Sequence, residues 1–202
     1  MFSAIFFDFD GVLVDSFAFH LKHLNEDARL PVSAERLRDL HAVNFHEATQ
    51  HDATFDGVDW VKYHQLIAPA EAKQPMHPLA QATIRELYER KERLYIVSSG
   101  VTAGIKHFLA EHSLSECFLD VFGYEQGLSK TEKLLNVANR SGINLQESLF
   151  VTDTAGDVCE GKAAGVPVLA VTFGFHDREM IKAASPEYLC DRWEEARHIL
   201  DL

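Results

Sequence analysis

An uninterrupted apolar run near the start of the chain, residues 4–7, ends in two carboxylates. Because the run has no polar alternation, it predicts a strand buried on both faces, as in a parallel sheet. Asp8 and Asp10 follow it, and Gly11 comes next. Residues two apart in a strand point the same way, so the acids can share a face, where their repulsion requires a proton or a cation between them. The alternative interpretation is an Asp-Gly turn, a common turn pair.

The next 60 or so residues show helical periodicity and no strand pattern. Asp15 or Ser16 can cap the first helix, and the polar, histidine-rich residues 44–57 have weak periodicity. A proline at each end of the segment 75–78 then breaks the chain. We therefore expect a helical insertion over residues 16–75, with helices at 17–30, 33–43 and 59–72.

Strand and helix patterns alternate from Leu79 to the end of the chain. Alternating units of this kind predict a parallel sheet with helices on both faces, and right-handed crossovers make it doubly wound. The predicted fold class is thus α/β, with a core formed by residues 1–15 and 76–202 and an all-helical insertion formed by residues 16–75. Four strands are expected here, at 94–97, 121–124, 149–151 and 167–171, and six helices, at 79–91, 101–112, 129–141, 158–164, 178–184 and 194–200.

Charge limits the classes of partner. The chain of 202 residues has a formal net charge of −12, with ordinary shares of apolar (47%) and charged (25%) residues. A net negative charge argues against nucleic acid or an anionic membrane as the main partner. A phosphate-bearing small molecule must then be attracted by a local cation. The residues leave the oligomeric state open between monomer and dimer.

The cysteines and the start of the chain bear on location. Cys117, Cys159 and Cys190 are scattered and odd in number, which predicts no disulfide framework and favours buried small hydrophobic residues in a reducing compartment. No apolar run approaches the length of a membrane span. Strand-like sequence begins almost at Met1, so we expect no signal peptide and a cytoplasmic protein.

Polar residues with suggestive chemistry follow four of the predicted strands. In a parallel sheet the carboxyl ends of all strands meet at one edge, so these groups can converge. Each has a structural alternative on its own: a turn that caps a helix, a solvated lysine in a first helical turn, or a helix N-cap. The four positions are Asp8 with Asp10, Ser98 with Ser99, Ser129 with Lys130, and Asp153 with Asp157.

Together these positions resemble the motifs of the haloacid dehalogenase-like superfamily, in its phosphatase and phosphomutase branch. The first is the segment Asp-Phe-Asp-Gly-Val-Leu-Val-Asp-Ser at residues 8–16, and the second is Tyr-Ile-Val-Ser-Ser at 95–99. The third is Ser129-Lys130, and the fourth is Leu-Phe-Val-Thr-Asp-Thr-Ala-Gly-Asp at 149–157. Thr152 departs from the family, which usually has Gly or an acid there. The resemblance implies a Rossmann-like core and a helical cap at residues 16–75.

The resemblance also implies roles for these residues. Asp8 is expected to be the nucleophile that forms an aspartyl-phosphate, and Asp10 the general acid and base. A Mg²⁺ ion would be held by Asp8, the Asp10 backbone carbonyl and Asp153. Ser98 and nearby backbone N–H groups would hold the phosphoryl oxygens, while Lys130 supplies positive charge at a helix N-terminus that also favours anions.

Further residues receive supporting roles. Asp157 is expected to orient a metal-bound water or Lys130. Gly11 and Ser99 are assigned to substrate binding, and His20 to contact with substrate or steering of Asp10. The other insertion histidines, His46 and His51 among them, are expected to be solvated surface residues. The insertion's own core is assigned to Phe45, Trp60 and Tyr63, and the core of the sheet to Phe6, Phe7 and Phe150.

The predicted function is therefore a Mg²⁺-dependent phosphatase acting on small phosphomonoesters, either phosphoglycolate-like or sugar phosphates. Phe173-Gly174-Phe175 resembles phosphoglycolate-type members. The alternatives are a β-phosphoglucomutase-type phosphomutase, which shares the core residues, and a non-catalytic binding module on the same fold. The insertion has few cationic residues and no cluster of them, which argues against a substrate with several phosphates.

Overall fold

The computed structural model describes residues 2–127 and 129–202 and contains a parallel sheet of six strands in the order β3-β2-β1-β4-β5-β6. Every neighbouring pair is parallel. The order runs outward in one direction from β1 to β3 and in the other from β4 to β6, so the reversal lies between β1 and β4. The strands are β1 (Ile5–Phe7), β2 (Leu94–Val97), β3 (Asp120–Phe122), β4 (Leu149–Thr152), β5 (Val168–Val171) and β6 (Tyr188–Cys190).

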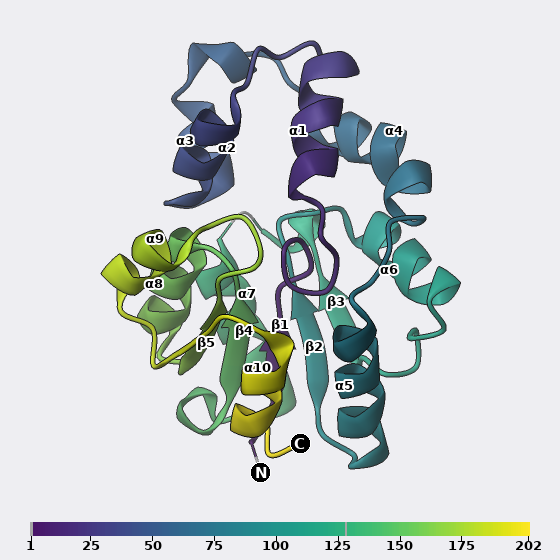
Figure 1. The fold of residues 1–202 in the computed structure, drawn as a ribbon, viewed down its shortest axis with the longest axis vertical. Helices are drawn as coiled ribbons and strands as arrows, with labels where there is room; N and C mark the ends of the chain where they lie inside the picture. The colour runs from purple at the N-terminus through teal and green to yellow at the C-terminus, as the bar shows by residue number, and fades with distance from the viewer. Residues whose placement is uncertain (1, 128) are drawn as a thin grey trace.

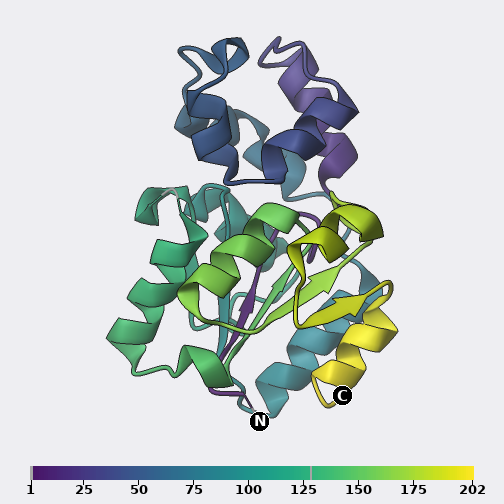
Figure 2. The same cartoon turned by 90° about the vertical axis from the view of Figure 1, so that its left-hand side faces the viewer.

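Six helices cover the two faces of the sheet (Figures 1 and 2). Ile5 and Phe7 of β1 pack in one apolar cluster, which includes residues of the three helices on one face of the sheet. Phe6 packs in a second cluster, which includes residues of the three helices on the opposite face. This alternation is what a strand buried on both faces requires. One face carries α5 (Pro78–Glu89), α6 (Thr102–Glu111) and α10 (Trp193–Ile199), and the other carries α7 (Lys130–Ser141), α8 (Ala155–Ala164) and α9 (Arg178–Ala184).

The insertion between β1 and β2 is all helical and lies above the carboxyl ends of the strands, opposite both chain termini (Figure 1). It has an apolar cluster of its own, which includes Leu24, Leu37, Leu40 and Ile67. Its elements are α1 (Phe17–Glu26), α2 (Ala34–His41), α3 (Phe45–Gln50) and α4 (Trp60–Glu71), with the short 3₁₀ helix η1 (Ala53–Phe55). Two further 3₁₀ helices, η2 (Tyr124–Gln126) and η3 (Leu145–Glu147), lie in the core.

The α/β doubly wound fold predicted from the sequence is confirmed, and the differences are local. The strand β6 was not predicted, because it is a short edge strand in which only Cys190 is buried. The helix α3 arises in the weakly periodic segment, where the Asn44 side chain caps it by accepting from the Glu47 N–H. The helix α8 begins three residues earlier than expected, because the Thr154 hydroxyl accepts from the Asp157 N–H.

Two expectations about side chains were wrong. Ser16 precedes α1 but makes no side-chain cap, because its hydroxyl donates to Asp10 instead. Cys159 is exposed, whereas Cys117 and Cys190 are buried as predicted. None of the helices within residues 2–127 and 129–202 combines the length and apolarity that crossing a membrane demands.

The central strands carry the core, so truncating one of their aromatic residues should be costly. Phe150 of β4 is fully buried, and Phe150→Ala should lower the free energy of unfolding by about 3–5 kcal/mol, since both transfer and cavity terms are lost. Urea denaturation followed by circular dichroism measures this. Leu66→Ala is the matched control: Leu66 is 62% exposed, and its truncation should change stability by less than about 0.5 kcal/mol. Equal effects of the two substitutions would contradict this account of the core.

Candidate active site

The reversal of strand order places two acidic loops side by side. Asp8 directly follows β1 and Asp153 directly follows the neighbouring strand β4. In open α/β sheets, ligands bind at the carboxyl ends of the strands where the order reverses. Carboxylate oxygens of Asp8, Asp153 and Asp157 lie within 4.8 Å of one another, and all three residues are buried.

A single lysine partly balances this charge. Lys130, the first residue of α7, donates from Nζ to Asp8 Oδ2 at 2.7 Å and to Asp157 Oδ2 at 2.6 Å. Burial opposes its charge, but the two carboxylates outweigh burial and raise the pKa of Lys130. For Asp157, burial is likewise outweighed by Lys130, and its pKa falls to about 2. Lys130 and Asp157 therefore form a buried ion pair that also holds one oxygen of Asp8.

The negative charges of the other two carboxylates, Asp8 and Asp153, are not fully offset by Lys130. Burial, with the nearby acid Asp157, raises the pKa of Asp8 well above its usual range despite Lys130. Burial also raises the pKa of Asp153 to about 8, although its Oδ2 accepts the Phe175 N–H at 2.7 Å. Its Oδ1 is buried and has no hydrogen-bond partner among the described residues. An orphaned buried oxygen beside a second carboxylate is the donor set that a hard divalent cation accepts, so these residues fit Mg²⁺.

The loop after β2 supplies the next group of polar atoms. The Ser98 hydroxyl is buried and accepts the Gly100 N–H at 3.0 Å, and Ser98 and Ser99 both line a cavity with Asp8 and Lys130. A second lysine supports this loop: Lys133 is fully buried and donates to the Ser98 carbonyl at 2.7 Å. Burial, with repulsion from Lys130, lowers the pKa of Lys133 to about 8. Lys133 lies one helical turn after Lys130, and that spacing is the sequence signal that could have identified it.

The first N–H of the helix that carries Lys130 is occupied by a side chain of α8. The Lys130 N–H donates to Glu160 Oε1 at 2.9 Å, and the Ser129 hydroxyl donates to the same oxygen at 2.8 Å. This N–H is therefore not available to an anion in the cavity. Lys130 offers its ammonium group instead.

Asp10 is turned away from the other acids. Its Oδ1 accepts the Ser16 hydroxyl at 2.6 Å and lies 2.9 Å from His20 Nε2, at the start of the insertion. Burial opposes ionisation, but His20 and Ser16 outweigh it and lower the pKa of Asp10 to about 2. Burial is likewise outweighed at His20, where Asp10 and Glu71 raise the pKa to about 10. Glu71, buried at 3.4 Å from His20, was missed, since nothing in its local sequence distinguishes it.

Only a glycine fits at position 11, because the backbone there passes very close to the Asp153 carboxylate. Its φ is +71°, and an added Cβ would lie 1.8 Å from Asp153 Oδ2. Gly174 meets the same oxygen from the other side, where a Cβ would lie at 2.2 Å. The two glycines let the backbone close around Asp153, and Gly11 lines neither of the two cavities near Asp10. Its assignment to substrate binding stays a prediction.

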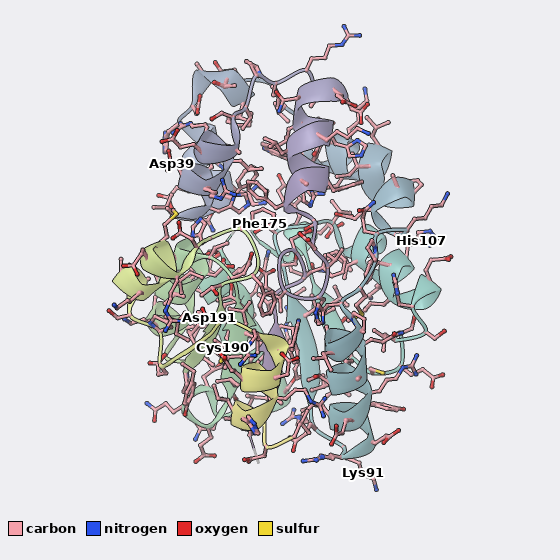
Figure 3. All side chains as sticks on the ribbon, viewed as in Figure 1. Asp39, Lys91, His107, Phe175, Cys190 and Asp191 are labelled. Carbon is pink, nitrogen blue, oxygen red and sulfur yellow. The ribbon has the colours of Figure 1, made fainter. Side chains whose placement is uncertain are left out.

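The insertion contacts the core directly over this site. Arg38 Nε donates to the Phe175 carbonyl at 3.0 Å, and His176 bridges the two parts by accepting the Ala155 N–H at 2.9 Å and donating to the Arg38 carbonyl at 2.9 Å. Phe175 packs edge-to-face on Phe17 with ring centroids 5.1 Å apart. Figure 3 shows Phe175 at the junction between the insertion and the sheet. The site is thus covered in this structure.

A second cavity lies between Asp10 and the insertion helices. The prediction that His46 is a solvated surface residue was wrong: it is only 2% exposed, and it lines this cavity. Its polar helix α3 lies against the core, where His46 Nε2 donates to the Ser99 carbonyl at 3.3 Å. His51 is exposed, as expected. The cavity is lined mainly by rings and imidazoles, including His20, His41, Phe45, Trp60, Tyr63 and His64.

Comparison with known proteins gives the family. A family model described as haloacid dehalogenase-like hydrolase matches residues 5–171, most of the chain. The chain belongs to this family. A phosphoglycolate phosphatase of Synechococcus elongatus is 26% identical over 217 residues, covering 93% of this chain and 92% of the relative. A phosphoglycolate phosphatase of Vibrio parahaemolyticus is 23% identical over 128 residues, covering 62% of this chain and 56% of the relative.

The solved structures support the haloacid dehalogenase-like fold. A predicted phosphatase from Clostridium acetobutylicum superposes with a TM-score of 0.83 at 20% identity, covering 100% of both chains. The chain spans only about half the length of several curated relatives that it matches.

Thr152, where the sequence departs from the family motif, supports the site in this structure. Its hydroxyl donates to Asp157 Oδ2 at 2.7 Å and helps hold the carboxylate that binds Lys130.

The buried imidazole of His46 predicts a specific acid sensitivity. Burial lowers its pKa to about 4, whereas a histidine in an unfolded chain has a pKa of about 6.5. Between these values the unfolded chain takes up a proton here and the folded chain does not, so stability is lost as pH falls from about 6.5 to 4. Relative to His46→Gln, the wild type should lose up to about 1.4 kcal/mol per pH unit in this window.

Urea denaturation of both proteins at pH 7.5, 6 and 5 measures this difference. The same series on Leu66→Ala, an exposed site on α4, should give a difference from the wild type that does not vary with pH. A constant difference for His46→Gln across the series would show that its imidazole is not held neutral.

Proposed function

We propose that this chain is a phosphatase that hydrolyses small phosphomonoesters through an aspartyl-phosphate on Asp8, with Mg²⁺ as cofactor. The observation that carries the proposal is the buried group Asp8, Lys130, Asp153 and Asp157 at the reversal of strand order. This buried group has three acids and one base, and one oxygen of Asp153 has no hydrogen-bond partner in the described part of the chain. Such uncompensated buried charge destabilises a fold by itself, whereas a bound cation would compensate it.

Asp8 is oriented for attack on phosphorus. Its Oδ1 accepts the Phe9 N–H at 2.7 Å and its Oδ2 accepts from Lys130, so both oxygens have defined positions. In the first step an Asp8 oxygen bonds to phosphorus while the bond to the leaving oxygen breaks. In the second, water attacks phosphorus and the Asp8 carboxylate leaves. Lys130 and the Ser98 loop would bind the phosphoryl oxygens.

Asp10 and His20 together would supply and recover the proton. In the closed structure Asp10 is ionised and His20 carries the proton, because their pKa values are shifted in opposite directions. The pair therefore holds one transferable proton beside Asp10 Oδ1. That proton would pass to the leaving oxygen in the first step and be replaced by one from the attacking water in the second.

Mg²⁺ would be held by the carboxylates of Asp8 and Asp153 and by the Asp10 backbone carbonyl. When bound, it would neutralise the negative charge that otherwise opposes attack of a carboxylate on a phosphate ester. Asp157 would act through Lys130, which it holds at 2.6 Å.

We further propose that residues 16–75 form a cap and that residues 1–15 and 76–202 form the catalytic core. The insertion has a separate apolar cluster, and its two connections to the core run side by side, joined by a bridge between Val14 and Met76. A cap hinged at such a pair of strands would exclude water when closed and admit substrate when open.

Replacing the nucleophile tests the mechanism. Asp8→Asn should lower the rate of phosphate release by about 10³-fold or more while the protein stays folded, because the amide cannot attack phosphorus. A phosphate-release screen over many metabolites, with Asp39→Asn as an exposed matched control, measures this. Release at the wild-type rate by the mutant would refute the aspartyl-phosphate. Isomerised product in place of free phosphate would instead select the phosphomutase alternative.

Removal and addition of the metal tests the cation site without measuring turnover. Chelator-treated wild type should gain thermal stability when Mg²⁺ is added, by about 2.7 kcal/mol at a hundredfold excess over Kd. Asp153→Asn should lose most of this gain, because a cation ligand is removed. An equal Mg²⁺-dependent rise in melting temperature for the wild type and Asp153→Asn would place the ion elsewhere.

A further inference from the structure

The cavity next to Asp10 contains two buried polar atoms with no partner in the part of the chain that is described. They are the hydroxyl of Tyr63, on α4, and Nδ1 of His46, on α3. Tyr63 is 7% exposed and His46 is 2% exposed. A buried polar atom without a partner is costly, so two of them in the wall of one cavity indicate groups that a ligand satisfies.

The hydrogen-bond roles of these atoms follow from their surroundings. His46 Nε2 lies 3.3 Å from the Ser99 carbonyl, which accepts only, so Nε2 carries the hydrogen. Burial keeps the ring neutral by lowering its pKa to about 4, so Nδ1 is a hydrogen-bond acceptor. Burial also raises the pKa of Tyr63, so its hydroxyl stays protonated and both donates and accepts. A ligand hydroxyl, which also donates and accepts, complements both atoms.

The same cavity is poorly suited to a carboxylate. Its lining residues include no lysine or arginine. The one protonated imidazole, His20, already lies 2.9 Å from Asp10 and 3.4 Å from Glu71, so its charge is offset by two carboxylates. A second anion would also face the acceptor Nδ1 of His46, and an unpaired buried charge is unfavourable.

Aromatic rings form the remaining wall. Trp60 packs edge-to-face against Phe45 and Tyr63, with centroids 5.1 Å and 5.9 Å away, and Phe175 closes the side next to Asp10. Such faces pack against the C–H surface of an uncharged alcohol.

We infer that this cavity binds the leaving group of the substrate and selects an uncharged, hydroxyl-bearing alcohol over a carboxylate, with Tyr63 and His46 as the specificity-determining residues. The inference rests on the proposed phosphatase function and chooses between its substrate classes. A sugar-like phosphate is favoured, and phosphoglycolate is disfavoured even though the relatives compared above are phosphoglycolate phosphatases.

Three esters of similar size test the selection. They are 2-hydroxyethyl phosphate, phosphoglycolate and ethyl phosphate, which present a hydroxymethyl, a carboxylate and a methyl group at the same position. The kcat/KM for 2-hydroxyethyl phosphate should exceed that for phosphoglycolate by about tenfold or more, because a buried unpaired charge costs more than a lost hydrogen bond. Equal or faster hydrolysis of phosphoglycolate would overturn the inference while leaving the phosphatase in place. Absence of phosphate release from every ester would instead remove the proposed function, and the inference with it.

A conservative substitution tests the residue assignment. In Tyr63→Phe the ratio of kcat/KM for 2-hydroxyethyl phosphate over ethyl phosphate should fall about 3- to 10-fold, the value of one hydrogen bond. Tyr88→Phe, on the exposed surface of α5, is the matched control and should leave the ratio unchanged. An unchanged ratio in Tyr63→Phe would show that the tyrosine does not read the hydroxyl. A fall in activity on both esters by the same factor would assign it a structural role only.

Discussion

The ion pair between Lys130 and Asp157 is the interaction on which the rest of the site depends. It joins α7 to α8 at the carboxyl edge of the sheet, and the lysine also donates a hydrogen bond to Asp8. Breaking such a pair by removing one partner would leave a buried charge without compensation. Thr152 fixes the carboxylate of this pair from below, and the backbone of Lys130 is itself held by Glu160. A lysine so restrained is a fixed positive charge beside Asp8.

The charge that Lys130 does not compensate explains the rest of the arrangement. Asp153 is enclosed by Gly11 and Gly174, which bring two backbone segments against its carboxylate. Asp10 would add another negative charge to this group, but its side chain turns toward Ser16 and His20 instead. The site is therefore divided into two halves, one formed by Asp8, Asp153 and Asp157 and the other by Asp10 and His20. This division follows from repulsion among buried carboxylates.

Side chains of the insertion reach the core loops that form both halves of the site. His20 reaches Asp10 from α1, His46 reaches the Ser99 carbonyl from α3, and Arg38 reaches the Phe175 carbonyl from α2. Each contact crosses from the insertion to a loop of the core, so side chains of the insertion belong to the site in this structure. A residue of the insertion's own core also lines the cavity: Tyr63 belongs to the insertion's apolar cluster and lies in the cavity wall with Asp10.

The sequence by itself determined the sheet, the acidic loops and the family. The runs at Ile5–Phe7 and 149–151 are apolar without alternation, which is the pattern of strands buried on both faces. Parallel strands then bring Asp8 and Asp153 to one edge, whatever the details of packing. Short-range patterns of this kind can be read directly from the sequence. The glycine that follows Asp10 and the serine that precedes Lys130 are two further examples.

Only the tertiary structure decided which polar residues are buried and what they contact. His46 lies in the short polar helix α3, and Glu71 is the charged last residue of α4. Neither position is marked as buried by its local sequence, yet both side chains are buried in the folded chain. Lys133, Glu160 and His176 acquire their partners from segments at least 21 residues away in the chain. Burial and hydrogen bonding of such side chains depend on how distant elements pack, and local periodicity carries no information about that packing.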